Sequence, residues 1–113
     1  MSTRAAGAAV ERRAALHYRL RGYRVLDRNA WAGGYELDLV VRRGRRLVFV
    51  EVKGKGGGGF GTPWEMVGPE KRRRLRQAAE TWLAARPELA ALPVSFDVVG
   101  VASGRLERIR DAI

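Results

Sequence analysis

The fold of this chain is decided by residues 35–53, which read YELDLVVRRGRRLVFVEVK. Two strand-like runs, at 35–42 and 46–53, flank a short connection in which Gly44 suits the positive φ of a tight hairpin turn. The second run is almost continuously apolar up to Val50, which is typical of a central strand covered on both faces. The stretch therefore predicts a buried β-hairpin.

The segments on either side of the hairpin extend this pattern to a single layered domain over residues 1–113. Apolar residues at spacings of three and four predict helices, and alternation with period two predicts strands. The expected elements are a helix over 3–21, strands over 23–27, 35–42 and 46–53, a helix over 69–86, a strand over 94–101, and a last strand or short helical end up to residue 113, with a turn over 29–34. This order, α-β-β-β-α-β-β, predicts an α/β domain whose central mixed sheet is flanked by helices.

Composition excludes several classes of protein. The chain has no cysteine and one histidine, so it is not a disulfide scaffold, a thiol enzyme or a protein with a His-rich metal cluster. The longest stretch without a charged residue is the glycine-rich segment 56–64, far shorter than the roughly 20 apolar residues of a membrane span. The N-terminus reaches Glu11 too soon for a signal-peptide core, so we expect a cytoplasmic protein that does not contact the membrane.

Positive charge is the strongest compositional feature. Lys and Arg number 22 against 12 Asp and Glu, a net charge of +10, which attracts polyanions such as nucleic acid. A high-GC genome would explain the preference for Arg over Lys, but not the surplus of basic over acidic residues. The basic residues form two clusters, one at the hairpin tip and one at the start of the second long helix, and either cluster alone could be a solvated face. Basic residues in the first turns of a helix oppose its dipole, however, unless they bind phosphate. The candidates for nucleic-acid contact are Lys55, in a glycine-rich loop able to approach a phosphate strand, Lys71 and Arg72 in the second long helix, and Arg43 and Arg45 at the hairpin tip.

Charged residues at the ends of the hairpin strands are the candidates for chemistry. Glu36 and Asp38 are two residues apart, as are Glu51 and Lys53, so each pair projects from one face of its strand. If the hairpin brings Asp38 beside Glu51, their carboxylates and the backbone carbonyl of Val52 supply the oxygen ligands that Mg²⁺ or Mn²⁺ prefers. Lys53 could then orient a water molecule or a phosphate.

Two further considerations bear on this hypothesis. Glu11 lies at the edge of the apolar stripe of the first helix, and it completes the acidic cluster if that helix crosses the strand ends; the stripe comprises Val10, Ala14, His17 and Leu20. The alternative is that all these charges form the solvated face of an ordinary hairpin. The argument against this alternative is that burying a charged triplet at the end of an apolar strand costs free energy unless the charges have a function.

These motifs resemble a known family. Gly34-Tyr35-Glu36-Leu37-Asp38 and the run from Leu47 to Lys53 are similar to the Gly-Glu-Ile-Asp and Phe-Val-Glu-Val-Lys of the YraN-like family of small uncharacterised bacterial proteins. Tyr35 departs from this pattern, as does Gly54-Lys55, where the family usually has Thr-Arg or Ser-Arg. The resemblance also takes in Gly22-Tyr23, Arg28-Asn29, Phe96-Asp97-Val98-Val99 and Asp111-Ala112-Ile113, so it covers nearly the whole chain.

The resemblance implies a fold and a site. The family is assigned to the restriction-endonuclease-like superfold, the PD-(D/E)XK group, and is similar in element order to archaeal Holliday-junction resolvases. In that group a helix glutamate, a strand aspartate and a Glu-x-Lys pair form the metal-dependent site, and the matching residues here are Glu11, Asp38, Glu51 and Lys53.

The expected function is that of a Mg²⁺-dependent endonuclease acting on DNA, on branched or damaged structures. A homodimer fits such a nuclease, because two symmetric sites cut two strands. One alternative is a non-catalytic nucleic-acid-binding or adaptor protein that keeps the nuclease fold. Another is a structural partner of a membrane or secretion system.

Overall fold

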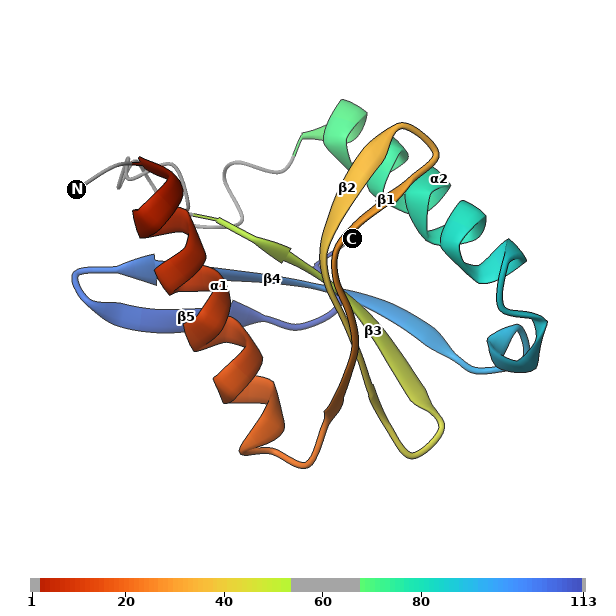
Figure 1. The fold of residues 1–113 in the computed structure, drawn as a ribbon, viewed down its shortest axis with the longest axis horizontal. Coiled ribbons are helices and arrows are strands. Elements are labelled where there is room, and N and C mark those ends of the chain that lie inside the picture. The colour runs from red at the N-terminus through yellow and green to blue at the C-terminus, as the bar shows by residue number, and fades with distance from the viewer. Residues whose placement is uncertain (1–2, 54–67, 113) are drawn as a thin grey trace.

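The computed structural model describes residues 3–53 and 68–112, and the side chains from residue 7 onward within them. The elements follow the expected order (Figure 1). They are α1 (Thr3–Arg19), β1 (Arg24–Ala32), β2 (Tyr35–Arg43), β3 (Arg46–Val52), α2 (Pro69–Ala84), the short 3-10 helix η2 (Pro87–Leu89), β4 (Val94–Ala102) and β5 (Arg105–Ile109). No helix in these ranges is long and apolar enough to cross a membrane.

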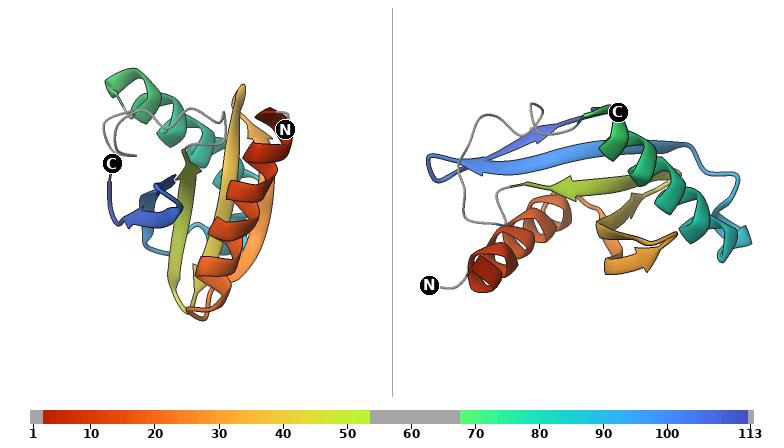
Figure 2. Two further views of the ribbon diagram at one scale, coloured as in Figure 1. Left: turned by 90° about the vertical axis from the view of Figure 1, so that its left-hand side faces the viewer. Right: turned by 90° about the horizontal axis from the view of Figure 1, so that it is seen from above.

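The strands form one mixed sheet in the order β1-β2-β3-β4-β5. Among the strand pairs of the described residues, β3–β4 is parallel and the others are antiparallel, and β3 is the central strand. Two hydrophobic clusters lie on opposite faces of the sheet, one under α2 and one under α1, and Figure 2 shows the helices on its two sides. This three-layer α/β architecture confirms the expected restriction-endonuclease-like class of fold.

The predicted hairpin of β2 and β3 is confirmed. Leu39 pairs with Val50 and Arg43 with Arg46, and the turn consists of Gly44, at φ 59°, and Arg45. Side chains of β3 alternate between the two clusters, because both faces of this central strand are covered. The apolar run in the sequence therefore reports burial on both sides.

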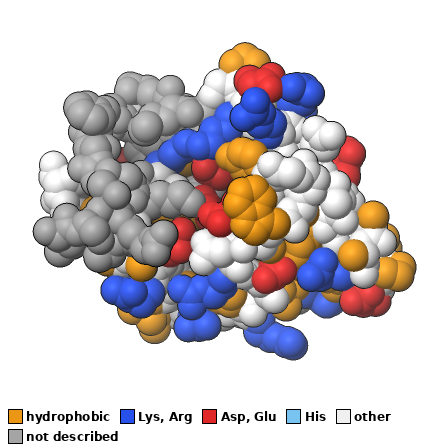
Figure 3. Space-filling view, turned by 45° about the horizontal axis from the view of Figure 1, so that its top comes forward, with side chains coloured by type: hydrophobic (Ala, Val, Ile, Leu, Met, Phe, Trp, Pro, Cys, Tyr) orange, Lys and Arg blue, Asp and Glu red, His pale blue; other side chains and the backbone are white. Residues whose placement is uncertain are grey.

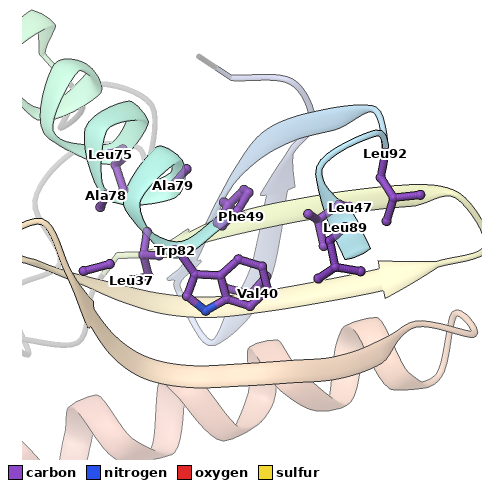
Figure 4. Packing of buried hydrophobic residues seen from close by; sticks show 11 residues of the cluster. Leu37, Val40, Leu47, Phe49, Leu75, Ala78, Ala79, Trp82, Leu89 and Leu92 are labelled. Carbon is purple, nitrogen blue, oxygen red and sulfur yellow. The ribbon is translucent and has the colours of Figure 1, made fainter. Parts of the chain in front are cut away.

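The cluster under α2 fixes that helix on the sheet (Figure 4). Trp82 contacts Phe49 edge to face, with ring centroids 5.6 Å apart, and its indole N–H donates to Asp27 Oδ2 at 2.9 Å. Leu75 and Ala78 lie on the same buried face, as the helical spacing predicts. This packing places the first turn of α2 beside the polar ends of the strands.

The buried face of α1 differs from the predicted stripe. Leu20 is 73% exposed beyond the end of the helix, whereas Ala14, Ala15 and Tyr18 are buried. The phase is set by Tyr18, whose hydroxyl donates to the buried Asp97 of β4 at 2.7 Å. Because positions i, i+3, i+4 and i+7 share one helix face, this phase puts Glu11 on the side that faces the sheet.

The predicted turn over residues 29–34 is wrong. β1 continues to Ala32, and the turn itself consists only of Gly33 and Gly34, both with positive φ. Gly33 packs so closely on α2 that a Cβ atom there would lie 3.0 Å from Thr81 Oγ1. Asn29 has a positive φ of 50° but does not end the strand, so a turn-forming residue gave a misleading signal.

Candidate functional site

The site begins where β2 and β3 separate. Their regular pairing stops at Leu39 and Val50, and Asp38 and Glu51 are the next residues beyond it. Asp38 is 3% exposed, and its Oδ2 accepts the backbone N–H of Val52 at 2.8 Å. The Asp38 carboxylate thus lies between the strand ends and accepts a hydrogen bond that a backbone carbonyl would accept in a regular strand pair.

Three carboxylates converge at this point. Glu11 of α1 and Glu36 and Asp38 of β2 each offer an oxygen, and these oxygens lie within 4.8 Å of one another. Glu11 and Asp38 come together from elements far apart in the sequence because α1 packs across β2 with its Glu11 face inward. Glu36, which sequence analysis noted only as a neighbour of Asp38, is part of the same acidic trio.

Asn29 is a site residue that sequence analysis missed. With its amide nitrogen toward α1, it donates to Glu11 Oε1 and Oε2, each at 3.2 Å. Asparagine tolerates the positive φ found here better than most residues, and that backbone shape marks the position as special. A lone asparagine inside a strand pattern is therefore the signal that could have revealed it.

Glu51 is, like Asp38, a buried acid of this site. Its side chain is 4% exposed; Oε1 accepts from Lys71 Nζ at 2.8 Å and lies 3.6 Å from Lys53 Nζ. Its other oxygen, Oε2, is buried with no hydrogen-bond partner among the described residues. Burial and then the charge of Asp38 raise the pKa of Glu51, and the two lysines oppose this shift.

The two lysines differ in how firmly they hold their protons. Burial, followed by a hydrogen bond with Lys71, lowers the pKa of Lys53 to about 8. Burial is the largest single influence on Lys71 and would lower its pKa, but the hydrogen bonds with Glu51 and Lys53 and the charge of Glu51 together outweigh burial and raise the pKa. Lys71 is therefore a firm counter-charge for Glu51, while Lys53 is the more readily neutralised of the pair.

Glu36, Asp38, Glu51 and Lys71 line one pocket of about 280 Å³, whereas Lys53 and Glu11 are not among its lining residues. Figure 3 shows acidic side chains in a hollow of the surface, with basic side chains above and hydrophobic ones beside them. The lining residues are Trp31, Gly34, Tyr35, Glu36, Asp38, Glu51 and Lys71. Strands β1, β2 and β3 and helix α2 each contribute to it, so the pocket exists only in the assembled fold.

Comparison with known proteins agrees with this architecture. The sequence pattern of the uncharacterised protein family UPF0102 matches residues 10–101. The chain belongs to the UPF0102 family. A UPF0102 protein of Xanthomonas campestris pv. campestris is 50% identical over 109 residues, which cover 94% of this chain and 88% of the relative. One from Paramagnetospirillum magneticum is 42% identical over 106 residues, covering 90% and 81%, and one from Methylocella silvestris is 39% identical over 99 residues, covering 88% and 78%. The expected membership of the YraN-like family is thereby confirmed.

The UPF0102 chain does not bring all of its candidate basic residues to this pocket. Arg43 and Arg45 lie at the hairpin tip. Together with Arg46 and the start of β4 they line a separate pocket. From Arg46 to Glu51 the strand advances five residues, about 17 Å at about 3.3 Å each. Arg43 also donates to the carbonyl of Arg21 at 2.9 Å and stacks over a tyrosine ring, which gives it a packing role.

Arg72 is the candidate that remains close to the pocket. It is exposed on the first turns of α2, next to Lys71, and lines a surface groove along that helix with Arg73 and Arg76. Lys55, the other basic candidate, lies outside the described residues.

The donor set of this UPF0102 site fits a hard divalent cation. Mg²⁺ takes oxygen ligands in a near-octahedral arrangement and keeps several waters. Asp38 and Glu51 offer carboxylates, and the carbonyl of Val52 lies on the side of β3 that faces β2, as its N–H does. Within the described part of the chain, Glu51 Oε2 is a buried carboxylate oxygen without a hydrogen-bond partner, which is costly unless something binds it, and a cation would satisfy it.

Proposed function

We propose that this UPF0102 protein is a Mg²⁺- or Mn²⁺-dependent nuclease that hydrolyses phosphodiester bonds in DNA. The observation that carries the proposal is the pocket at the strand ends, where Glu51 Oε2 is buried with no hydrogen-bond partner among residues 3–53 and 68–112, and where Glu36 and Asp38 of the acidic trio share the lining with Glu51. Burying the Glu51 carboxylate costs free energy, and a cation bound beside it would offset part of that cost. A phosphodiester can approach such a site only if its own charge is offset there.

Asp38, Glu51 and the carbonyl of Val52 would hold the ion. A bound divalent cation lowers the pKa of water and offsets the charge that develops on the phosphate in the transition state. The hydrogen bond from the N–H of Val52 fixes the orientation of the Asp38 carboxylate, and Lys71 does the same for Glu51. These contacts preorganise the acids before substrate binds.

The remaining charged residues would act on water and phosphate. Lys53 lies 3.6 Å from Glu51, so its ammonium group can orient the attacking water or the scissile phosphate. Glu11, held by Asn29, closes the acidic trio on the α1 side, where it would accept hydrogen bonds from ordered water. A homodimer would place two such sites on one DNA and belongs to the same proposal.

The test is a cleavage assay on the intact protein. Linear duplex, single-stranded, flapped and four-way-junction DNA are incubated with Mg²⁺, with Mn²⁺, or with EDTA. Metal-dependent cleavage of any of these substrates, abolished by EDTA, supports the proposal. DNA binding without cleavage under every condition would instead support a non-catalytic nucleic-acid-binding protein that keeps the fold.

DNA binding itself is expected to depend on Arg72. Replacing Arg72 with glutamine should lower affinity similarly for all DNA sequences and should reduce the slope of log K against log salt by about 1, because each phosphate contact releases about one counter-ion. Fluorescence anisotropy at several salt concentrations measures both effects.

Arg74→Gln is the matched control for this variant. Arg74 lies two residues further along the same helix, but its guanidinium already pairs with Glu70 at 3.1 Å. The salt slope should therefore change less in Arg74→Gln than in Arg72→Gln. Equal slopes for Arg72→Gln and the wild type would mean that DNA does not run over this face of α2.

A further inference from the structure

Trp31 stands out among the described aromatic side chains. Tyr18, Tyr23, Phe49 and Trp82 are at most 4% exposed, whereas Trp31 is 73% exposed. Exposure of so large an apolar surface loses the free energy that burial would give. Because the indole also lines the acidic pocket, its exposure coincides with the candidate active site.

The backbone under Trp31 is firmly held. Trp31 pairs with Glu36 across the β1–β2 hairpin, so the indole stands beside a member of the acidic trio. On the opposite face of β1, Ala32 is buried under α2, and the following Gly33 packs against Thr81. The hairpin is thus anchored on α2, and its exposed ring needs little ordering to receive a ligand.

We infer that Trp31 stacks on the base of an unpaired nucleotide next to the scissile phosphate. This inference rests on the proposed nuclease function and narrows its substrate class to DNA with a single-stranded stretch, such as a flap, a gap or a branch point. Aromatic side chains bind single-stranded DNA by stacking on base faces, and every base offers such a face.

Both the size and the place of the pocket favour an unpaired base. Inside an intact duplex each base is stacked on both sides, so a fixed indole can reach a base face only where the stack is interrupted. The pocket, at about 280 Å³, lies just below the roughly 300–1,000 Å³ of common small-molecule sites. It can therefore admit one nucleotide but not a double helix. The basic groove of Arg72, Arg73 and Arg76 on α2 could carry the flanking phosphates.

The test uses DNA with a single-stranded flap that carries 2-aminopurine at the first unpaired position, in Ca²⁺ to allow binding without cleavage. Wild-type protein should quench the fluorescence, because stacking on indole quenches this base. Trp31→Ala should abolish the quenching and weaken flap binding about tenfold, within the range of one base–aromatic stack. Trp31→Phe should retain part of both effects, and fully paired duplex should bind equally to all three proteins.

The control variant is Leu20→Ala. Leu20 has the same exposed fraction as Trp31, 73%. It lies just after the C-terminal end of α1, whereas Glu11 lies in the middle of that helix. The variant should bind flapped DNA as the wild type does. Unchanged quenching and affinity in Trp31→Ala would overturn the stacking inference. An equal loss of affinity for flapped and duplex DNA in this variant would overturn it too. In either case, metal-dependent cleavage by the wild-type protein would still support the nuclease. Wild-type protein that binds none of these DNAs would overturn both.

Discussion

Replacing Asp38 with asparagine is expected to lower the rate of metal-dependent DNA cleavage about 100- to 1,000-fold or more. Asparagine has the shape of aspartate, and its side-chain oxygen can still accept the N–H of Val52, which now donates to Asp38 Oδ2 at 2.8 Å. The strand ends therefore keep their geometry. What is lost is a negative charge that the cation needs, and single-turnover cleavage measures the loss.

Binding and stability separate this effect from damage to the fold. DNA affinity in Ca²⁺ should stay within about threefold of wild type, because phosphate contacts by basic residues supply most of the affinity. Asp38→Ala should add a loss of stability, since the buried N–H of Val52 would then lack its acceptor. Glu88→Gln, an exposed acid in η2, removes the same charge outside the pocket and should cleave normally. Full activity in Asp38→Asn would exclude Asp38 as a metal ligand.

Local sequence patterns predicted the parts of the fold that are dominated by local contacts. The β2–β3 hairpin and α2 follow from alternation, a turn glycine and helical spacing, all read within short windows. The phase of α1 did not follow in the same way. Its Ala-rich sequence has little contrast between faces, so one distant contact, from Tyr18 to Asp97, decides which side is buried.

The site was predictable to the extent that it lies on one hairpin. Hairpin register alone led to the expectation that Asp38 lies beside Glu51, whereas Glu11 could be added only on the condition that the first helix crosses the strand ends. Asn29 could not be found because its position depends on the β1–β2 pairing, and the wrongly predicted turn over residues 29–34 had removed that pairing.

The basic residues at the hairpin tip illustrate a different limit. Arg43 and Arg45 were predicted to contact nucleic acid because they are basic and flank the hairpin tip, and that contact stays a prediction; the structure places them away from the acidic pocket. Hairpin geometry itself separates them, since the tip is the part of a hairpin furthest from its open ends. A charge cluster therefore needs a position in the topology before it can be assigned to a site.

The largest expected effect on stability comes from Asp97, far from the pocket. This carboxylate is fully buried; its Oδ2 accepts from Tyr18 at 2.7 Å and from Arg108 at 2.9 Å, and its Oδ1 accepts the N–H of Asp111 at 3.2 Å. Arg108 is itself only 6% exposed. Asp97→Ala should cost about 3–5 kcal/mol in the free energy of unfolding, because it leaves a buried guanidinium without its partner.

Urea denaturation followed by circular dichroism measures this cost. The paired variant Asp97→Asn/Arg108→Met should lose less than Asp97→Ala, since it removes both charges and keeps an acceptor for Tyr18. A larger loss in the paired variant would mean that the charge pair is not the source of the stability. A domain of this size has about 5–15 kcal/mol in total, so Asp97→Ala approaches the limit of folding.

The same network connects stability to the site. Tyr18 ties α1 to β4 through Asp97, and Glu11 lies seven residues earlier on the same helix face, about 10 Å away at about 1.5 Å per residue. Loosening that tie should let Glu11 move from Asp38, while Asp38 and Glu51 stay in place on their hairpin. Tyr18→Phe, which removes the hydroxyl that donates to Asp97, should therefore cleave more slowly although every pocket residue is intact. Cleavage at the wild-type rate would show that Glu11 does not depend on this anchor.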